Sequence, residues 1–412
     1  MNSLPGNALL WVFYSVQIIL LIFLLFPFLN TFVGLFLSRA KVKSSADSVK
    51  DTDFAIIITA YKDVLITLPS VDSLLKQKYS NYHIYLVADN CSPLEYPLSS
   101  DKLSVLFPSP FLNSKTKSIL HAIENFSSTH DYIVIFDPDN LAHPDYLNEI
   151  NRFCSKGYRA IQGRRAPKNL DTVYSRIDAL SDYYYNHTQR LIPFLLGSSA
   201  TIAGSGMAIE SKTYTRMVQE IENENLSKPI IVAEDKMLQN KLVLEDNIIA
   251  YAPDAIVYDE KTSSGAQVTQ QRTRWLNSYF LHLLDSLRII FKGIAAFNFN
   301  ITYFGLVIST PPLVIIGLYS LLFLGVNFVI SIQMAIAWLI GFSIFLINVV
   351  LSAYLSNAEK EILYSVPKLP LFVFNQILAL FRLKRSNKEF MVTEKSKTIY
   401  IDDILKQKQN KQ

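Results

Sequence analysis

Long uncharged, apolar runs mark the parts of this chain that we expect to lie in a membrane. No charged side chain precedes Arg39, and the run from Trp11 to Leu37 is almost wholly apolar. A membrane-spanning helix takes roughly 20 such residues. A cleaved signal peptide is the alternative, but its basic residues would precede the apolar run, whereas Arg39, Lys41 and Lys43 follow it. We therefore predict a membrane anchor, with the N-terminus outside and the following domain in the cytoplasm.

Further apolar runs lie in the second half of the chain. The uncharged run from Ile301 to Leu355 has room for two more spans with a short turn near Asn327. The run from Leu369 to Leu383 is shorter and starts beside prolines, which favours an amphipathic helix at the interface over a fourth span. Leu276 to Phe297 mixes apolar and charged residues and has the same interpretation. The pattern predicts three spans and a cytoplasmic C-terminus.

Between these runs, short buried-strand patterns alternate with helical ones. Strands are predicted at Phe54–Thr59, His83–Ala88 and Tyr132–Phe136, and helices at Leu68–Gln77 and Lys115–Phe126. Such alternation predicts a mostly parallel sheet that is covered on both faces. The fold class is therefore α/β, with one Rossmann-like domain inserted between membrane helices.

Composition agrees with a membrane-bound enzyme. Half of the residues (50%) are hydrophobic, and the mean hydropathy of +0.22 is high for a soluble enzyme. A net charge of +4 is too small to indicate a nucleic-acid partner, and the basic residues beside the spans suit anionic lipid headgroups. Cys91 and Cys154 have no disulfide or metal-site spacing, which fits a reducing cytoplasm.

Two carboxylates, Asp137 and Asp139, directly follow the third predicted strand. Ligands of such sheets lie beyond the carboxyl ends of the strands. A D-x-D pair there could hold Mg²⁺ or Mn²⁺, which would neutralise the negative charge that develops on a leaving diphosphate. The structural alternative is a turn in which Asp and Pro satisfy the backbone geometry.

Three more polar residues suggest catalytic or binding roles. Asp89 ends the second predicted strand, where it could accept hydrogen bonds from a nucleobase or ribose. Lys115 starts a predicted helix and could hold phosphate oxygens, although a solvated lysine is the default. Asp235 is a candidate general base that would take a proton from an attacking hydroxyl. It could also stabilise a helix N-terminus, and the two roles are compatible.

A Gln-x-x-Arg-Trp string, made of Gln271, Arg274 and Trp275, follows these signals. In this order, the residues resemble the membrane-integrated family-2 glycosyltransferases, the group of the cellulose, chitin and hyaluronan synthases. The resemblance covers nearly the whole chain and implies a GT-A-like domain between transmembrane helices. It also implies that the three residues line the acceptor site, where Trp275 would offer an aromatic face to a sugar ring.

The resemblance implies roles at the strand ends as well. Tyr61, Asp63 and Asp89 would contact the base or ribose of the nucleotide. Asp137 would bind the nucleotide and, together with Asp139, the metal ion. The family's first motif usually ends in Tyr-Asn-Glu, so Asp63 stands in place of a related hydrogen-bond acceptor.

Two further motifs come from the same resemblance. Glu234-Asp235 matches the general-base motif, with Ala233 in place of the usual Thr. A second string, with Phe390 and Thr393 as members, matches the F-x-V-T-x-K gating loop of bacterial cellulose synthases, and Lys395 completes it. The gating loop implies a processive enzyme, whereas three spans are few for a synthase that secretes its product unaided.

The sequence thus predicts a metal-dependent, inverting glycosyltransferase in the inner membrane. It would move a hexose or N-acetylhexosamine from a UDP-sugar to a growing polysaccharide, with export or oligomer partners. One alternative is a single transfer to a lipid-linked acceptor. A non-enzymatic transporter or sugar-nucleotide-binding scaffold is disfavoured, because the sequence has no G-x-x-x-x-G-K loop and its apolar runs have no charged residue.

The predictions divide the chain into five parts. They are a membrane anchor with a basic linker (1–50), a cytoplasmic glycosyltransferase domain (51–275), an interfacial helix (276–300), a transmembrane hairpin (301–356), and a C-terminal part with an interfacial helix, the gating-loop motif and a polar tail (357–412).

Overall fold

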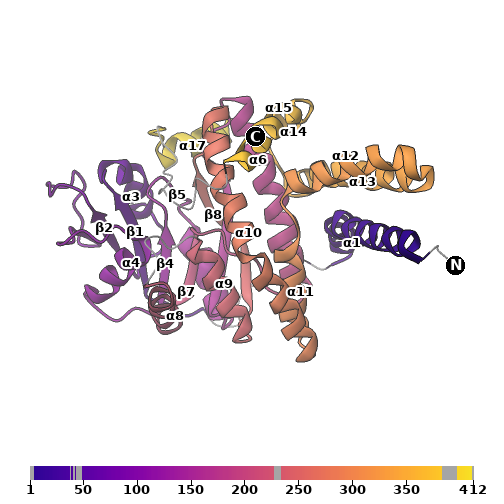
Figure 1. The fold of residues 1–412 in the computed structure, drawn as a ribbon. Coiled ribbons are helices and arrows are strands. Elements are labelled where there is room, and N and C mark those ends of the chain that lie inside the picture. The colour runs from indigo at the N-terminus through magenta and orange to yellow at the C-terminus, as the bar shows by residue number, and fades with distance from the viewer. Residues whose placement is uncertain are drawn as a thin grey trace.

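The computed structural model describes residues 4–37, 39, 42, 49–226, 233–382 and 397–410. An eight-stranded sheet forms its centre (Figure 1). In chain order the strands are β1 (Phe54–Tyr61), β2 (Tyr82–Asp89), β3 (Leu103–Leu106), β4 (Tyr132–Phe136), β5 (Leu141–Ala142), β6 (Ala160–Pro167), β7 (Met207–Glu210) and β8 (Ile249–Asp259). The α/β prediction is confirmed, and the predicted strands fall on β1, β2 and β4.

One edge of the sheet collects the ends of six strands. The strand order is β3-β2-β1-β4-β7-β6-β8-β5. β7 is antiparallel to both of its neighbours, β4 and β6, so β6 and β8 point the same way as β1, β2, β3 and β4. The carboxyl ends of these six strands therefore lie at the same edge, where parallel sheets place their ligands.

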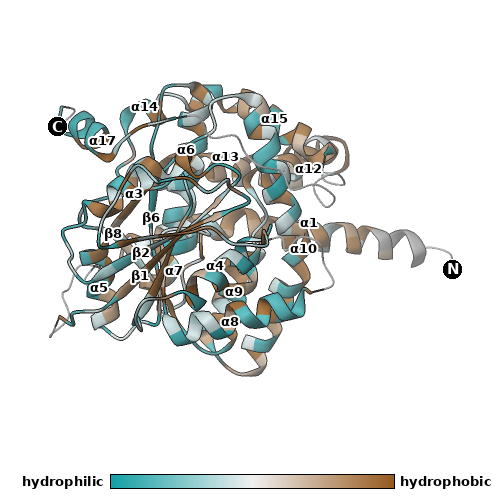
Figure 2. Cartoon of the chain, turned by 90° about the vertical axis from the view of Figure 1, so that its left-hand side faces the viewer, coloured by the Kyte–Doolittle hydropathy of each residue, from teal (hydrophilic) through white to brown (hydrophobic). Residues whose placement is uncertain are grey.

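Helices cover both faces of the sheet, as the edge-on view shows (Figure 2). Those of the sheet-containing domain are η1 (Leu65–Thr67), α3 (Leu68–Leu75), α4 (Lys115–Glu124), α5 (Tyr146–Ser155), α6 (Val173–Tyr185), η2 (Asn186–Leu191), α7 (Ile192–Leu195), α8 (Ser211–Glu224) and α9 (Glu234–Leu244). Because both faces are covered, β1 and β4 are mostly apolar, and every side chain from Phe54 to Ile58 is fully buried. This core fixes the strand ends that carry the candidate site.

Most of the remaining helices lie on the side of the molecule away from β1 and β2, whereas the last helix, α17 (Ile401–Gln409), packs against α3 (Figure 1). The others are α1 (Leu4–Gly34), α10 (Gly265–Ala295), α11 (Phe299–Ser309), α12 (Leu313–Ile330), α13 (Ile332–Leu355), α14 (Lys360–Leu363), η3 (Val366–Lys368) and α15 (Leu369–Phe381). α1, α12 and α13 project from the body as an arm (Figure 1). The predicted turn near Asn327 was misplaced: α12 continues to Ile330, and the chain reverses at Ser331.

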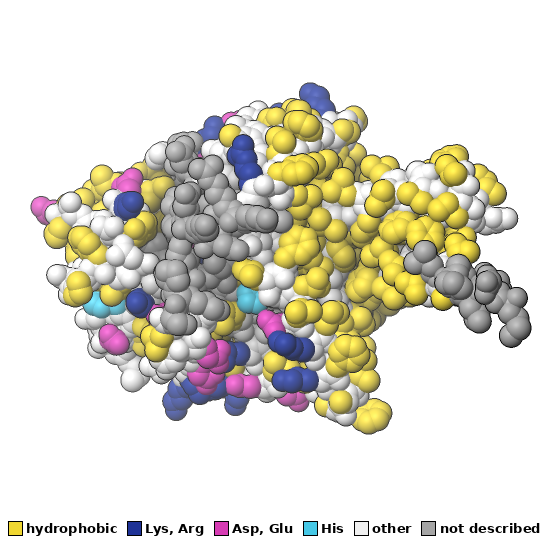
Figure 3. Space-filling view, in the orientation of Figure 1, with side chains coloured by type: hydrophobic (Ala, Val, Ile, Leu, Met, Phe, Trp, Pro, Cys, Tyr) yellow, Lys and Arg dark blue, Asp and Glu magenta, His cyan; other side chains and the backbone are white. Residues whose placement is uncertain are grey.

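Within the residues that the structure describes, four segments are long and apolar enough to cross a membrane. Three of them, Leu10–Gly34, Leu313–Ile330 and Ile332–Leu355, match the predicted spans. The fourth, Lys360–Phe381, includes most of the segment that we predicted to lie at the interface. Hydrophobic side chains cover the arm and continue onto the adjoining side of the body (Figure 3). The chain is therefore suited to association with a membrane.

Helix α10 joins two segments that the sequence analysis had separated. It runs unbroken from Gly265 to Ala295, so it contains both the Gln-x-x-Arg-Trp string and most of the predicted interfacial helix. Its distal half exposes large apolar side chains, among them Leu284 and Phe291, which are 65% and 70% exposed. One rigid element thus connects the candidate acceptor residues with the apolar surface.

A polar cluster lies in the centre of the arm. Gln17 Oε1 accepts hydrogen bonds from Asn327 Nδ2 at 2.6 Å and from Trp338 Nε1 at 2.7 Å, and all three side chains are fully buried. These bonds join α1 to α12 and α13. Because the surroundings are apolar, burying these two donors without this acceptor would cost free energy.

We expect Gln17→Ala to destabilise the arm, because it leaves the Asn327 and Trp338 donors buried without their shared acceptor. Such a loss costs about 1–3 kcal/mol, and the thermal unfolding midpoint of the detergent-solubilised protein should fall. Gln333→Ala is the control, since Gln333 is exposed at the start of α13. Equal midpoints for the two variants would contradict the structural role of the cluster.

Candidate active site

The ends of β1 and β2 bring two predicted nucleotide-binding residues together. Tyr61 and Asp89 are direct partners in the β1–β2 register. The Tyr61 hydroxyl donates to Asn113 Oδ1 at 3.0 Å, and Asp89 Oδ1 accepts from the Leu112 backbone N–H at 2.8 Å. Asp63 lies apart from this contact, because its carboxylate accepts from the Leu65 N–H at 2.9 Å and supports the turn into η1.

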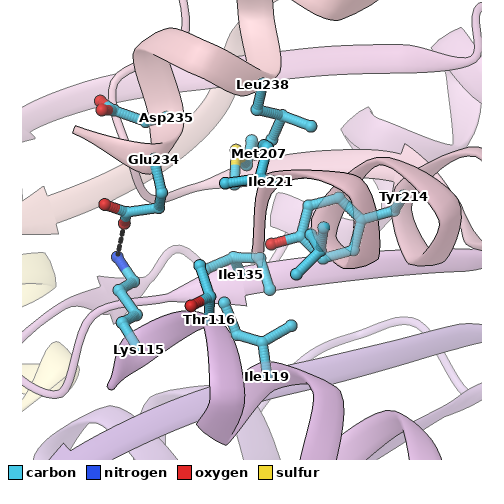
Figure 4. A pocket seen from close by; sticks show the side chains of 11 residues that line it. Lys115, Thr116, Ile119, Ile135, Met207, Tyr214, Ile221, Glu234, Asp235 and Leu238 are labelled. Atoms are coloured by element: carbon cyan, nitrogen blue, oxygen red, sulfur yellow. Dashed lines mark ion pairs between the residues drawn. The ribbon is translucent and has the colours of Figure 1, made fainter. Parts of the chain in front are cut away.

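Lys115 is the centre of the site (Figure 4). Ser114 has an extended backbone and caps α4, which makes Lys115 the first residue of the helix. The Lys115 ammonium lies 3.1 Å from Asp137 Oδ1 and 3.4 Å from Glu234 Oε1, and it donates to the Gly204 carbonyl at 3.3 Å. Burial lowers the pKa of Lys115, but the two carboxylates outweigh burial and hold this pKa above its usual value. The lysine is thus a fixed cation.

Glu234 and Asp235 begin α9 and point in different directions (Figure 4). Ala233 precedes them in the left-handed region, at φ 61°, a conformation that costs a residue with a Cβ about 1–2 kcal/mol. Burial raises the pKa of the Glu234 carboxyl, and the negative charge of Asp235 raises it further. Lys115 lowers this pKa but only in part, so the pKa of Glu234 stays above its usual value. Strained backbone of this kind is concentrated at functional sites.

Asp235 approaches the loop before β7. A Cβ atom on Gly204 would lie 3.3 Å from Asp235 Oδ2, and Gly204 has a φ of +80°. Glycine therefore allows the carboxylate and the loop to come close. A very small pocket is lined by Lys115, Glu234 and Asp235 among others (Figure 4). It has room for about one water molecule, so it is too small for a sugar nucleotide.

The D-x-D residues have different surroundings. Asp137 is partly exposed and faces Lys115, whereas Asp139 is 7% exposed and its Oδ2 accepts from the Glu260 N–H at 3.3 Å. Among the described residues, no three His, Cys, Asp or Glu side chains converge as a metal site. Mg²⁺ is commonly bound by one or two carboxylates together with substrate phosphates. Of the pair, Asp137 is the partly exposed carboxylate that such an ion could reach.

Within the Gln-x-x-Arg-Trp string, Arg272 occupies a position that the motif leaves open. Arg272 is 5% exposed, pairs with Asp178, and places its guanidinium 4.2 Å from the Trp275 ring centroid. Gln271 is 7% exposed, and its Oε1 is buried without a hydrogen-bond partner within the described ranges. Arg274 is partly exposed. Trp275 was expected to offer an aromatic face to a sugar ring, and Arg272 covers one of its two faces.

The sequence analysis missed the loop of residues 197–206. Three of its carbonyls accept hydrogen bonds from buried or partly buried cations: Gly204 from Lys115, Ala203 from Arg165 and Thr201 from Arg190. The Gly-Ser-Gly run before β7 was the available signal, because Gly204 and Gly206 both have positive φ angles. The predicted gating residues Phe390, Thr393 and Lys395 lie outside the described residues.

Comparisons with known proteins identify the family of the domain. The model of a family described as "Glycosyltransferase like family 2" matches residues 52–278, which is more than half of the chain. A search of curated proteins finds no match. Among solved structures, the mannosyltransferase PcManGT from Pyrobaculum calidifontis, in complex with GDP-Man and Mn²⁺, is similar with a TM-score of 0.51 and 14% identity, covering 90% of this chain and 99% of its own. Residues 1–349 of TarS from S. aureus give a TM-score of 0.39 and 13% identity, covering 85% of this chain and 95% of their own.

We expect Lys115→Met to destabilise the domain in a pH-dependent way. Without the ammonium, the pKa of Glu234 rises further above its unfolded value. A carboxyl group with a raised folded pKa contributes least stability above that pKa, so the deficit should grow as the pH rises. At neutral pH we expect a melting temperature about 2–8 °C below that of the wild type, for a loss of about 1–2 kcal/mol.

Lys117→Met is the matched control, because Lys117 is on the same helix, is half-exposed, and lies 3.8 Å from Glu222. Thermal unfolding of both variants would be followed between acidic and neutral pH. A deficit for Lys115→Met that is independent of pH would contradict the coupling to Glu234.

Proposed function

Because this chain belongs to glycosyltransferase family 2, we propose that it transfers a sugar from a nucleotide donor to an acceptor held at the membrane. The observation that carries the proposal is the convergence of Lys115, Asp137 and Glu234 beside Asp235, at the strand-end edge of the family-2 domain. A cation for phosphate oxygens and a carboxylate for a hydroxyl proton thus lie next to each other.

The donor would bind with its diphosphate near Lys115. Tyr61 and Asp89, which are register partners at the ends of β1 and β2, would contact the base or ribose, together with Asp63. Asp137 and Asp139 would hold Mg²⁺ or Mn²⁺, which supplies charge neutralisation for the leaving diphosphate. The Mn²⁺ and GDP-Man in PcManGT support a divalent metal in this fold. For this chain we propose a UDP-sugar, on the motifs of its sequence.

Asp235 would act as the general base. The acceptor hydroxyl oxygen forms a bond to the anomeric carbon, while the bond from that carbon to the diphosphate oxygen breaks. The diphosphate leaves with the electron pair, and Asp235 takes the hydroxyl proton. A single displacement of this kind inverts the anomeric configuration. The rigid helix start at Glu234 fixes the position of the base.

The acceptor has two candidate identities. The motifs predict repeated addition of a hexose or N-acetylhexosamine to a growing polysaccharide. The packing of the arm favours the second candidate, a single transfer to a lipid-linked acceptor. Leu24 of α1 and Trp338 of α13 are fully buried between the helices, so the described part of the arm is filled by its own side chains. A polymer made here would need an export partner to leave the cell.

We expect Asp235→Asn to keep nucleotide binding but to lower turnover by about 10²-fold or more, as the loss of a general base does. Transfer from a panel of radiolabelled UDP-sugars would be measured in membranes, with and without a chelator. Asp246→Asn, at the other end of α9, is the control. Loss of binding together with activity would show a structural role, and full activity in chelator would contradict the metal assignment.

We also propose that the catalytic domain and the C-terminus face the cytoplasm of a multi-pass inner-membrane protein, because basic residues follow the first span. A reporter fused after Gln412 should then read as cytoplasmic. An external reporter would mean that Lys360–Phe381, the fourth apolar segment, crosses the membrane and that our assignment of three spans is wrong.

A further inference from the structure

The turn between β4 and β5, which carries the D-x-D pair, is held by segments from far along the chain. Asp139 Oδ2 accepts a hydrogen bond from the Glu260 N–H, just after β8, at 3.3 Å. Asn140 Oδ1 accepts from the Ser205 hydroxyl, in the loop before β7. The turn then enters β5, which has only the two residues Leu141–Ala142, whereas strands usually have about 3–10. So short a strand fixes little by itself, and the position of the turn depends on contacts from outside.

The C-terminal helix α17 supplies one of these outside contacts. β5 is an edge strand of the sheet, and α17 lies beside it (Figure 1). Ile401 and Ile404 of α17 are buried in one hydrophobic cluster with Leu141 of β5. Leu141 is only two residues after Asp139, so the apolar face of α17 packs directly against the strand into which the D-x-D turn leads.

A second, polar contact joins the C-terminal segment to Asp139 through Glu260. The Lys397 N–H donates to Glu260 Oε2 at 3.2 Å, and the Glu260 N–H donates to Asp139. Glu260 is 5% exposed, so its side chain is enclosed by the protein. The Lys397 ammonium also lies 2.6 Å from the carboxylate of Asp171. Residues 397–409 therefore reach the D-x-D turn by an apolar contact and by a hydrogen-bonded one.

Ion pairs fasten both ends of α17 as well. Near its start, Asp402 lies 2.8 Å from the ammonium of Lys76 on α3. Near its end, the Lys408 ammonium lies 3.6 Å from Glu359, which precedes α14. The side chains of these pairs are partly or largely exposed, and exposed ion pairs contribute little to stability. The buried apolar contact and the buried hydrogen bond are therefore the ones that determine where the turn lies.

We propose that residues 397–409 form part of the donor site by positioning the Asp137–Asp139 turn, with Glu260 as the positioning residue of the polar contact. This inference rests on the proposed function, in which the turn acts on the leaving diphosphate. The segment lies outside residues 52–278, to which the family model matches, so membership of the family does not by itself imply this role. A displacement of about 1 Å at a site can lower a reaction rate by about 10²-fold, so a small shift of the turn is enough to impair the site.

Hydrogen exchange of the full-length protein in detergent tests the positioning directly. In the peptide of residues 137–142, the Asn140 and Ala142 amides are hydrogen-bonded. Glu260→Ala and Ile404→Ala should each speed exchange in this peptide by about 10-fold, because local opening becomes easier by about the contribution of one buried contact. Exchange in β1, at the centre of the sheet, should stay as in the wild type.

Gln407→Ala is the control for hydrogen exchange, because Gln407 is exposed on the same helix. Should Ile404→Ala fail to fold, Ile404→Val takes its place and should give a smaller increase. Wild-type exchange at residues 137–142 in the Glu260 and Ile404 variants would overturn the proposal. An equal increase in β1 would overturn it as well, because the contacts would then stabilise the domain as a whole and not the turn.

The affinity for UDP, titrated in the presence of Mn²⁺, tests the consequence for the donor. Glu260→Ala should weaken UDP binding by about 10-fold. Glu260→Gln should restore most of the affinity, because its amide oxygen can still accept from the Lys397 N–H. Unchanged affinity of Glu260→Ala would contradict the positioning role. Equal losses in both variants would contradict it too, because the negative charge of Glu260 would then matter and not its hydrogen bond.

The two readouts separate this proposal from the proposed function. Wild-type protein that binds UDP, with variants that lose affinity as expected, but that transfers no sugar from any UDP-sugar, would contradict the transferase activity alone. Wild-type protein that transfers sugar, with Glu260→Ala and Ile404→Ala variants that match it in exchange and in UDP affinity, would contradict the positioning role alone.

Discussion

The ammonium group of Lys115 is the interaction on which the site depends. It joins the start of α4, the turn after β4, the start of α9 and the loop before β7, which are far apart in the sequence. Asp137 and Glu234 would repel each other without it, because both carboxylates lie against the same ammonium group. β1, β4 and β6 point the same way, so the segments that follow them lie at one edge of the sheet. The positive charge of Lys115 then stabilises the two neighbouring carboxylates.

The acceptor side depends on a second set of buried charges. Arg272 pairs with Asp178, and Asp178 also accepts from the Thr262 N–H and hydroxyl at 3.0 and 2.9 Å. These contacts hold α10 against α6 and the segment after β8. α10 is one unbroken helix, so Trp275 keeps a fixed position relative to the exposed apolar side chains of its second half. Removing one member of such a buried pair is strongly destabilising.

The hydrophobic pattern of the sequence predicted the strands that are apolar on both faces, and it also pointed to the aspartates at or just after their carboxyl ends. It could not predict β6, because Arg164 and Arg165 interrupt the strand and Asp259, far along the chain, neutralises one of them. The antiparallel β7 has only four residues and gives no periodic signal. Arg190 was also hidden, since nothing local distinguishes a buried arginine from a solvated one. Conversely, the Asp137 signal was readable because the D-x-D motif directly follows the end of β4.

The central claim is that one carboxylate, Asp235, activates the acceptor for a single displacement at the anomeric carbon. The most direct measurement is the anomeric configuration of the product, read by proton NMR after transfer from an α-linked UDP-sugar by the purified protein. The account predicts a β-linked product that forms without a covalent sugar–enzyme intermediate. An α-linked product would require a second nucleophile or a different mechanism, and would contradict the role given to Asp235.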